Sequence, residues 1–357
     1  MKILIVTQKI DRTDAILGFM HEWIREFAKQ TEGVVAIGLG VGEYELPLNV
    51  KVASLGKEGS RLKIQGFRKI QYTLRFWWLI WKHRNEYDAV FVHMNQVYVI
   101  LGAPIWKLLG KKVSLWYAHG HVPASLHIAE KLTDLIFTST KSGCRLASKK
   151  IRVIGQGIDI QKFKAGGSRF KVQGSRKFNI VTVGRIAASK GVETLVDAVA
   201  ILKEGGRLVR AEVVGGPVVA ADNAYFEQIQ KQVREKGLER DFSFPGPVAN
   251  RDLPVRLQDA DLFVNMGKTG SLDKAVPEAM ATELPVLTSN EAFLEVLGPY
   301  TNDLMYSPGD AAGLASKIEA IMDMEPQKYR ELGVALREIV VKDHGLERFI
   351  RAIVSAL

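Results

Sequence analysis

The segment FNIVTVGRIAASKG, residues 178–191, joins an apolar run to a polar loop that opens with a glycine. The run has the length of a buried strand, and Ser189 is a candidate cap for a following helix. The preceding residues 156–177 are rich in Gly, Ser and unpaired charge, as linkers are. The segment therefore predicts that a second strand–helix domain begins after a linker.

Strand and helix patterns alternate on both sides of this segment. The alternation predicts an α/β fold of two Rossmann-like, doubly wound domains that face each other across a cleft, with ligands beyond the carboxyl ends of the strands. The expected domains are residues 1–165 and 166–340, followed by a helix at 341–357 that could return to the first domain. The expected strands are residues 2–7, 34–39, 50–55, 89–94, 112–118, 135–140, 151–155, 178–183, 209–215, 242–246, 261–265, 284–289 and 303–307.

Composition limits the class of protein. A single cysteine, Cys144, excludes an intrachain disulfide and suits a reducing compartment. The opening MKILIVTQKID reaches charge too soon for a signal peptide. The most apolar stretch, residues 97–109, is shorter than a membrane span. These features predict a soluble, cytoplasmic protein.

Positive charge is concentrated in the front half. Residues 1–170 carry 26 basic and 13 acidic side chains, a net charge of +13, whereas the remainder carries −3. Within this half, residues 61–84 show a helix-period apolar stripe with Lys and Arg at its edges: Phe67, Ile70, Leu74, Trp77, Trp78 and Trp81. Such a helix is typical of peripheral contact with an anionic membrane, although a core-facing helix with a basic edge has the same pattern. No nucleic-acid motif accompanies the charge.

Two glycine-containing loops follow predicted strands. Gly184 is followed by Arg185 and Lys190, so that two cations lie near an expected helix start, where backbone N–H groups favour anions. This arrangement suits a diphosphate, but a solvated loop with an ordinary cap has the same residues. Gly215 and Gly216 end another strand, which allows either close approach of a ligand or a tight turn.

The segment GSLDKAVPEAMATELPVLTS, residues 270–289, places the carboxylate of Glu278 in an otherwise apolar helical turn. A partly buried carboxylate must accept strong hydrogen bonds or be paired with a cation. A vicinal diol such as a ribose supplies two donors, and a neighbouring basic side chain or backbone amide is the alternative. The residues before the helix include Gly270, Ser271 and Asp273, so the amides of 271–275 could face an anion.

His119 follows the predicted strand 112–118 in the first domain. A residue at that strand end can reach a ligand beyond the edge of the sheet. A lone histidine is more often structural, and this is our interpretation of His21, His83, His93 and His127.

Taken in order, these motifs resemble those of GT-B nucleotide-sugar glycosyltransferases, specifically retaining family 4, which belongs to the glycosyl transferases group 1. The matching motifs are AHG (118–120), QGIDIQKF (156–163), VGRIAASKG (183–191), VVGGP (213–217), FPGPV (244–248), DADLFV (259–264) and PEAMATELPV (277–286). The resemblance covers most of the chain and is specific between residues 112 and 290.

The resemblance implies roles for individual residues. Arg185 and Lys190 would hold the donor diphosphate, Glu278 would bind the ribose hydroxyls, and His119 would face the transferred sugar. The base pocket would be lined by Pro247 and Val248. The further candidate substrate-binding residues are Gly18, Gly184, Gly215, Gly216, Gly270, Ser271, Leu272 and Lys274, and the glycines at 215 and 216 would lie near the donor.

The chain departs from the family pattern at three places. The family's first glutamate, eight residues before the second, is Gly270 here, and the nearest carboxylate is Asp273. The glycine usual before the x-Pro step is Glu283, and the glycine pair after the first strand is missing, with Gly18 as the only candidate. Our hypothesis is that Asp273, with Lys274, takes over part of the role of the missing glutamate.

The implied activity is transfer of a sugar from a UDP- or GDP-type donor to a glycan or lipid-linked acceptor, with retention of configuration and without a metal or other cofactor. Residues 1–165 would form the acceptor side and residues 166–340 would bind the nucleotide sugar. The implied setting is polysaccharide or cell-envelope biosynthesis, in the cytoplasm or at the inner face of the cell membrane. An epimerase or phosphorylase on the same scaffold, and a non-catalytic relative that only binds nucleotide sugar, remain alternatives.

Overall fold

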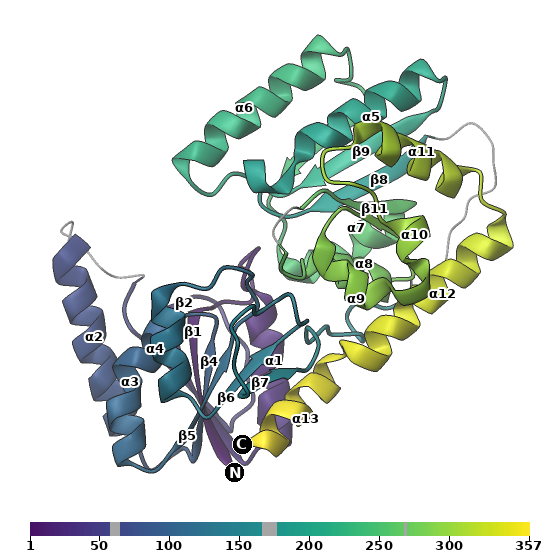
Figure 1. The fold of residues 1–357 in the computed structure, drawn as a ribbon. Coiled ribbons are helices and arrows are strands. Elements are labelled where there is room, and N and C mark those ends of the chain that lie inside the picture. The colour runs from purple at the N-terminus through teal and green to yellow at the C-terminus, as the bar shows by residue number, and fades with distance from the viewer. Residues whose placement is uncertain (58–64, 166–176, 268–269) are drawn as a thin grey trace. The chain divides into compact units, whose positions relative to one another are not determined.

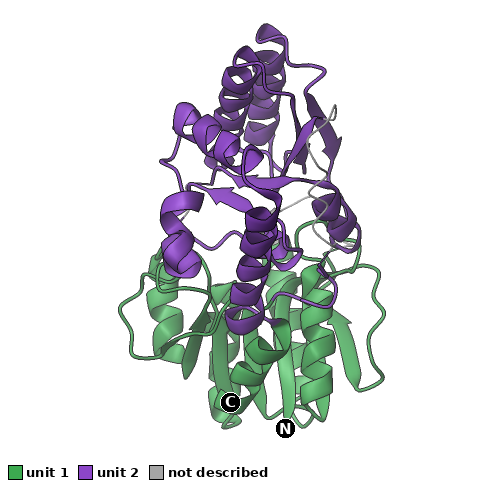
Figure 2. Cartoon of the chain, turned by 90° about the vertical axis from the view of Figure 1, so that its right-hand side faces the viewer, with its two compact units in different colours: residues 1–157, 346–357 green, residues 158–345 purple. Residues whose placement is uncertain are grey.

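The computed structural model describes residues 1–57, 65–165, 177–267 and 270–357. The chain forms two compact units (Figure 2). Unit 1 contains Met1–Gly157 and Leu346–Leu357, and unit 2 contains Ile158–Gly345. Each unit has its own parallel sheet, covered by helices on both faces.

Unit 1 is built on a seven-stranded parallel sheet with the order β3-β2-β1-β4-β5-β6-β7. In the first strand, Ile3 and Ile5 enter one core while Leu4 and Val6 enter the other, because successive side chains of a strand point to opposite faces. The strands are β1 Lys2–Ile10, β2 Gly33–Val41, β3 Val50–Ser54, β4 Ala89–His93, β5 Lys112–Trp116, β6 Leu135–Thr138 and β7 Ile151–Val153. The helices are α1 Phe19–Gln30, α2 Gln65–Lys82, α3 Gln96–Leu108, α4 Ala124–Leu132 and α13 Leu346–Ala356 (Figure 1).

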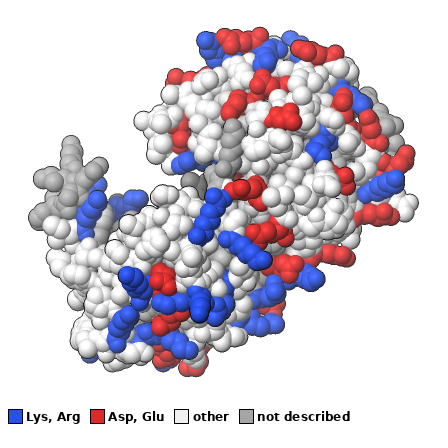
Figure 3. Space-filling view, in the orientation of Figure 1, with Lys and Arg blue, Asp and Glu red and all other residues white. Residues whose placement is uncertain are grey.

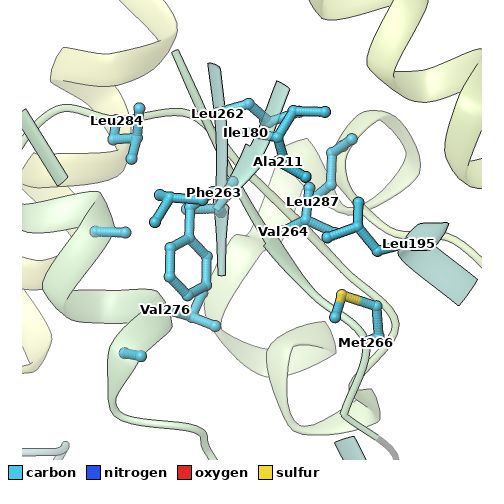
Figure 4. Packing of buried hydrophobic residues seen from close by; sticks show 14 of the residues in the cluster. Ile180, Leu195, Ala211, Leu262, Phe263, Val264, Met266, Val276, Leu284 and Leu287 are labelled. Atoms are coloured by element: carbon cyan, nitrogen blue, oxygen red, sulfur yellow. The ribbon is translucent and has the colours of Figure 1, made fainter. Parts of the chain in front are cut away.

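Unit 2 is built on a five-stranded parallel sheet with the order β10-β9-β8-β11-β12. Its core joins residues of the central strands to α8, and Phe263, Val264 and Val276 are among the side chains seen in Figure 4. The strands are β8 Phe178–Val183, β9 Val209–Val214, β10 Phe242–Gly246, β11 Leu262–Asn265 and β12 Val286–Thr288. The helices are α5 Val192–Glu204, α6 Ala220–Glu235, α7 Leu253–Asp259, α8 Ala275–Ala281, α9 Leu294–Leu297, α10 Thr301–Leu304, α11 Ala311–Met322 and α12 Pro326–Asp343, with short 3₁₀ turns at Ala188–Lys190, Asn250–Asp252, Glu291–Phe293 and Gly298–Tyr300.

In each sheet, the direction in which successive strands are added reverses beside the strand that comes first in the sequence. In unit 2 the neighbours β8 and β11 mark this reversal, because the chain moves from β8 toward β9 and β10 and later returns to the other side of β8. Loops that follow strands on the two sides of such a point diverge and leave room for a ligand. The loops after β8 and β11 are therefore the first place to look for a site.

The units divide the chain differently from the predicted domain limits. Ile158 and Phe163 are buried in the core of unit 2, and the Ile158 N–H donates to the His344 carbonyl at 2.7 Å. The contact boundary therefore lies after Gly157, before the predicted 165. The last helix, α13, starts at Leu346 and packs in the core of unit 1, where the Phe349 ring lies 4.4 Å from that of Trp23.

Several local predictions need correction. Ser189 does not cap a long helix, because it lies in a 3₁₀ turn and α5 begins later, after a left-handed Gly191. Residues 303–307 were expected as a strand, but the segment begins in the short helix α10 and only Met305 bridges to β12. Sequence periodicity over five residues does not distinguish these cases.

Two described non-glycine residues, Met94 with a φ of 61° and Glu283, occupy a backbone conformation that favours glycine. Glu283, which stands where the resembled family has glycine, has a φ of 64°. It lies in the turn between α8 and β12, where its N–H donates to the Met280 carbonyl at 3.0 Å. The turn keeps its left-handed geometry at a cost of about 1 kcal/mol or more for a residue with a Cβ.

Within the residues that the structure describes, no helix combines the length and apolar character needed to cross a bilayer.

Candidate functional site

Three loops at the carboxyl ends of β8, β9 and β10 are joined by backbone hydrogen bonds. The Gly184 N–H donates to Val214 at 2.9 Å, the Gly215 N–H to Gly246 at 3.0 Å, and the Ile186 N–H to Gly216 at 3.1 Å. Gly215 has a φ of 136°, and a Cβ there would lie 2.9 Å from the Gly184 carbonyl carbon and closer still to its oxygen. Only glycine fits at this crossing, so the sequence fixes a closely packed backbone edge.

A shallow hollow opens between the loop after β8 and the end of β11. Its lining includes Gly184, Arg185, Lys190, Asn265 and Met266. A larger hollow lies at the starts of β8 and β9, where Arg210 and Arg256 line it. Because ligands of open parallel sheets bind beyond the carboxyl ends of the strands, the smaller hollow is the candidate site.

Lys190 is held in place by an acidic partner from the loop after β11. Its ammonium group forms an ion pair and hydrogen bond with the Asp273 carboxylate. The same carboxylate accepts a hydrogen bond from Asn265 Nδ2 at 3.1 Å, and Asn265 Oδ1 accepts one from Thr288 Oγ1 at 2.9 Å. A chain of polar contacts thus runs from the end of β12 through β11 to the lysine in the β8 loop.

Arg185 has a looser acidic partner. Its Nε lies 3.6 Å from Asp222 Oδ2, and 44% of its side chain is exposed. Asp222 accepts hydrogen bonds from the backbone N–H groups of Val218 and Val219, at 3.0 and 3.2 Å. The Val218 hydrogen bond, with help from Val219 and the Arg185 charge, lowers the pKa of Asp222 against the opposing effect of burial. The guanidinium therefore lies beside a fixed carboxylate and still faces solvent.

Glu278 is 4% exposed and lies in a cluster of polar side chains. Burial raises its pKa to about 7, although the charges of Lys274 and Lys162 and a hydrogen bond with Asn250 oppose the increase. Burial also lowers the pKa of Lys274 to about 7, opposed by the charge of Glu278. Asn250 in turn accepts a hydrogen bond from Lys162 Nζ. The basic neighbours match the alternative that the sequence left open, and they also keep a buried carboxylate ready to accept hydrogen bonds.

The segment between β11 and α8 differs from the expected anion-binding helix end. Helix α8 begins at Ala275, the last of the residues 271–275 whose amides were expected to face an anion, and it is only seven residues long. Leu272 is buried in the core of unit 2, so its side chain serves packing. The Ser271 carbonyl accepts a hydrogen bond from Asn290 Nδ2 at 2.8 Å. We therefore assign no anion-binding role to the end of this helix.

The expected base-pocket loop adjoins the glycine pair of β9. A Cβ on Gly216 would lie 3.4 Å from Pro247 Cδ, and Val248 packs partly against the core of unit 2. Asn250, which hydrogen-bonds with Glu278, comes two residues after Val248. The loop after β10 is therefore connected to the carboxylate expected to bind ribose.

In unit 1, Gly18 and His119 follow strands β1 and β5. Gly18 immediately precedes helix α1 and is buried. His119 is exposed, and its Nδ1 accepts a hydrogen bond from the His121 N–H at 3.0 Å. In the neutral ring the proton then resides on Nε2, which is the atom able to donate to a ligand.

Sequence reasoning missed four residues of these clusters: Lys162, Asp222, Asn250 and Asn265. Asn265 had the clearest signal, because it is the polar last residue of an otherwise apolar strand. The others lie on loops or helix starts, where polar residues are common. In the described ranges, no cluster of three or more His, Cys, Asp and Glu side chains could hold a metal ion.

The comparison with known protein families gives a match within unit 2. Residues 177–324 match the family model described as Glycosyl transferases group 1. We refer to this matched segment, which is less than half of the chain, as the group 1 domain. The group 1 domain contains every unit 2 residue of the candidate site described above except Lys162. The finer assignment to retaining family 4 stays a prediction.

The sequence matches to curated relatives are longer than the group 1 domain. Mannosylfructose-phosphate synthase of Agrobacterium fabrum is 28% identical over 195 residues, which cover 52% of this chain and 42% of the relative. The GDP-mannose-dependent alpha-(1-6)-phosphatidylinositol monomannoside mannosyltransferase of Mycobacterium tuberculosis is 25% identical over 218 residues, covering 53% and 54%. The chain spans about half the length of these curated relatives.

A solved structure matches the whole chain. The Anabaena protein Alr3699/HepE, in complex with UDP and glucose, has a TM-score of 0.76 and 19% identity and covers 100% of this chain and 99% of its own. At this identity the likeness shows the fold alone. The prediction of a GT-B fold with two Rossmann-like α/β domains is confirmed.

Proposed function

We propose that the chain is a glycosyltransferase that moves a sugar from a nucleotide-diphosphate sugar to a glycan or lipid-linked acceptor. The observation that carries the proposal is the hollow beside β8 and β11, where Arg185 and Lys190 line one site at the switch point of the group 1 domain. Two cations at such a point suit the diphosphate of a nucleotide sugar.

The names of similar proteins support both substrates. The Anabaena structure contains UDP and glucose, which supports a UDP-type donor. The mycobacterial relative is named for GDP-mannose and for a phosphatidylinositol monomannoside, which supports a GDP-type donor and a lipid-linked acceptor. Work at the inner face of the cell membrane, with peripheral contact through helix α2, is part of the proposal. Residues 61–64 of the predicted membrane segment lie outside the described residues.

The proposed chemistry centres on the leaving group. Negative charge grows on the diphosphate as the bond from the anomeric carbon to oxygen breaks, and preorganised cations lower the energy of that state. Lys190 is preorganised by Asp273, while Arg185 is the more exposed partner. With these two cations the reaction is proposed to proceed without a metal ion and with retention of configuration. We assign the Nε2 of His119 to the transferred sugar.

The ionisation of Glu278 predicts that the affinity for the nucleotide sugar depends on pH. The carboxylate accepts from both ribose hydroxyls only when it is ionised, and its pKa is raised to about 7 by burial. Affinity for a nucleotide sugar should therefore rise as the pH increases and Glu278 ionises, in a titration that Glu278 shares with the neighbouring Lys274. The measurement is calorimetric titration with a nucleotide sugar, whose diphosphate carries no proton in this range. Glu278→Gln should bind more weakly and show no such rise, and a wild-type affinity independent of pH would contradict the ribose assignment.

The direct test of the function is a screen of UDP- and GDP-sugars. A true donor at 100 times its Kd should stabilise the protein by about 2.7 kcal/mol, seen as a rise in Tm. The same donor should release nucleotide faster when lipid-linked or glycan acceptors are added. Stabilisation without turnover would favour a non-catalytic relative, and conversion of the nucleotide sugar without transfer would favour an epimerase. No stabilisation by any donor would refute the proposal.

A further inference from the structure

Helix α2 has two apolar faces, and the core accounts for only one of them. Phe76, Leu79 and Ile80 are buried, and the Phe76 ring lies 5.5 Å from that of Tyr98 in α3. A helix that packs on a sheet normally turns its other face to water with polar residues. In α2 this other face is apolar as well.

The second face is a continuous stripe of large side chains. It repeats at the helical spacing, and the exposed fractions are 60% for Ile70, 58% for Leu74, 40% for Trp77, 57% for Trp78 and 46% for Trp81. The Trp77 Nε1–H donates to the Leu101 carbonyl of α3 at 2.8 Å, which fixes one end of this ring while the stripe faces outward. The sequence pattern was compatible with a core-facing stripe, and the structure overturns that interpretation for these five residues.

Along the described part of α2, the charged side chains that border the stripe are positive. Residues 65–82 contain no Asp or Glu, and Lys69, Arg75 and Lys82 are exposed. Lys82 Nζ lies 4.7 Å from the centre of the Trp78 ring, and the Arg84 guanidinium carbon lies 4.8 Å from that of Trp81. Figure 3 shows Lys and Arg predominating over acidic side chains on the visible face of unit 1. Tryptophans flanked by cations are the composition of helices that lie in a membrane interface.

We propose that the outer face of α2 docks on an anionic lipid bilayer, with the helix lying in the plane of the membrane and its five apolar side chains entering the interface. The inference deepens the proposed function, on which it rests for its purpose: it names the surface that brings the enzyme to a lipid-linked acceptor. Anionic headgroups would neutralise the border cations. A second copy of this face would instead place like charges together, because a two-fold interface pairs a surface with itself.

The test is sedimentation with vesicles of phosphatidylcholine alone or with 30% phosphatidylglycerol. The protein should bind the anionic vesicles, and binding should weaken when NaCl is raised from about 0.1 to 0.5 M because salt screens exposed charge. Trp78→Ala with Trp81→Ala should lower the partition coefficient at least tenfold. Brominated lipid should quench the tryptophan fluorescence of the wild type more strongly than that of this double variant, which keeps only Trp77 of the three stripe tryptophans.

Two control variants distinguish insertion of the α2 stripe from nonspecific binding to the vesicles. Leu48→Gln removes a fully exposed apolar side chain elsewhere in unit 1, and Lys231→Glu reverses an exposed charge on α6 of unit 2. Both should sediment like the wild type, whereas Lys82→Glu should bind less. Equal binding by the wild type and the double tryptophan variant would overturn the proposal. A lipid-free dimer that the double variant dissociates would also overturn it and assign the face to a second copy.

Donor-side measurements keep this inference separate from the proposed function. The double variant should retain the Tm rise with nucleotide sugar, because α2 lies outside the group 1 domain. Vesicle binding without any donor binding would leave the docking surface standing and refute the glycosyltransferase. Donor binding and transfer to a water-soluble acceptor without vesicle binding would support the glycosyltransferase and refute the docking surface.

Discussion

Replacing Lys190 with alanine is expected to lower kcat/KM for sugar transfer by about 10² to 10³, with most of the loss in kcat. The ammonium group lines the hollow with Arg185 and is already held by Asp273. It therefore meets the charge of the leaving diphosphate without first having to reorganise. Initial rates of nucleotide release, measured with saturating and limiting donor, separate the two constants.

Two further variants control the Lys190 experiment. Lys190→Arg keeps a cation and should recover part of the rate, whereas loss from a merely structural role would not depend on charge. Lys231→Ala, which removes an exposed lysine paired with Glu235 on α6, should leave kcat unchanged. An alanine variant of Lys190 within threefold of the wild-type rate, with unchanged Tm, would contradict our assignment of the diphosphate site.

Gly215→Ala should be the most destabilising single change at the site, at about 3 kcal/mol or more. The added methyl group would overlap the Gly184 carbonyl, and the backbone at φ 136° disfavours any residue with a Cβ. Because the loops after β8 and β9 hydrogen-bond each other, donor affinity should fall as well. Hydrogen exchange at the amides of β8 and β9, with and without donor, measures both effects.

Gly237→Ala is the matched control for this clash. Gly237 also has a positive φ, of 63°, but a Cβ there would meet nothing within 4 Å. This variant should lose only about 1 kcal/mol, the cost of the left-handed backbone alone. If the two variants were equally stable, contact with Gly184 would not be the reason for glycine at 215.

The elements of the fold could largely be predicted from the sequence, because both sheets are parallel and buried. The run from Lys2 to Thr7 is apolar on both faces, and the structure buries Ile3 and Leu4 in different cores. The secondary structure of short segments was harder to predict. Residues 303–307 have strand-like composition, yet the helical turn of α10 and an isolated bridge at Met305 satisfy their backbone groups.

The sequence could predict individual residues of the candidate site, but it could not predict the contacts between them. Arg185 and Lys190 were placed in one loop from sequence alone. The partnership of Lys190 with Asp273 joins residues 83 positions apart, and it exists because β8 and β11 are neighbours in the sheet. Strand order is set by tertiary packing, which periodicity does not reveal. The same limit applies to α2, since helical spacing shows a stripe but not whether a core or solvent faces it.

The return of α13 to unit 1 has a consequence for biosynthesis. The chain enters unit 2 at Ile158 and leaves it at Gly345, residues that form a parallel bridge, so unit 2 is an insertion whose two ends meet. Phe349 and Ile350 complete the core that contains Trp23 and Phe27. On the ribosome, the inserted unit can therefore finish folding while the unit synthesised first still waits for the final dozen residues.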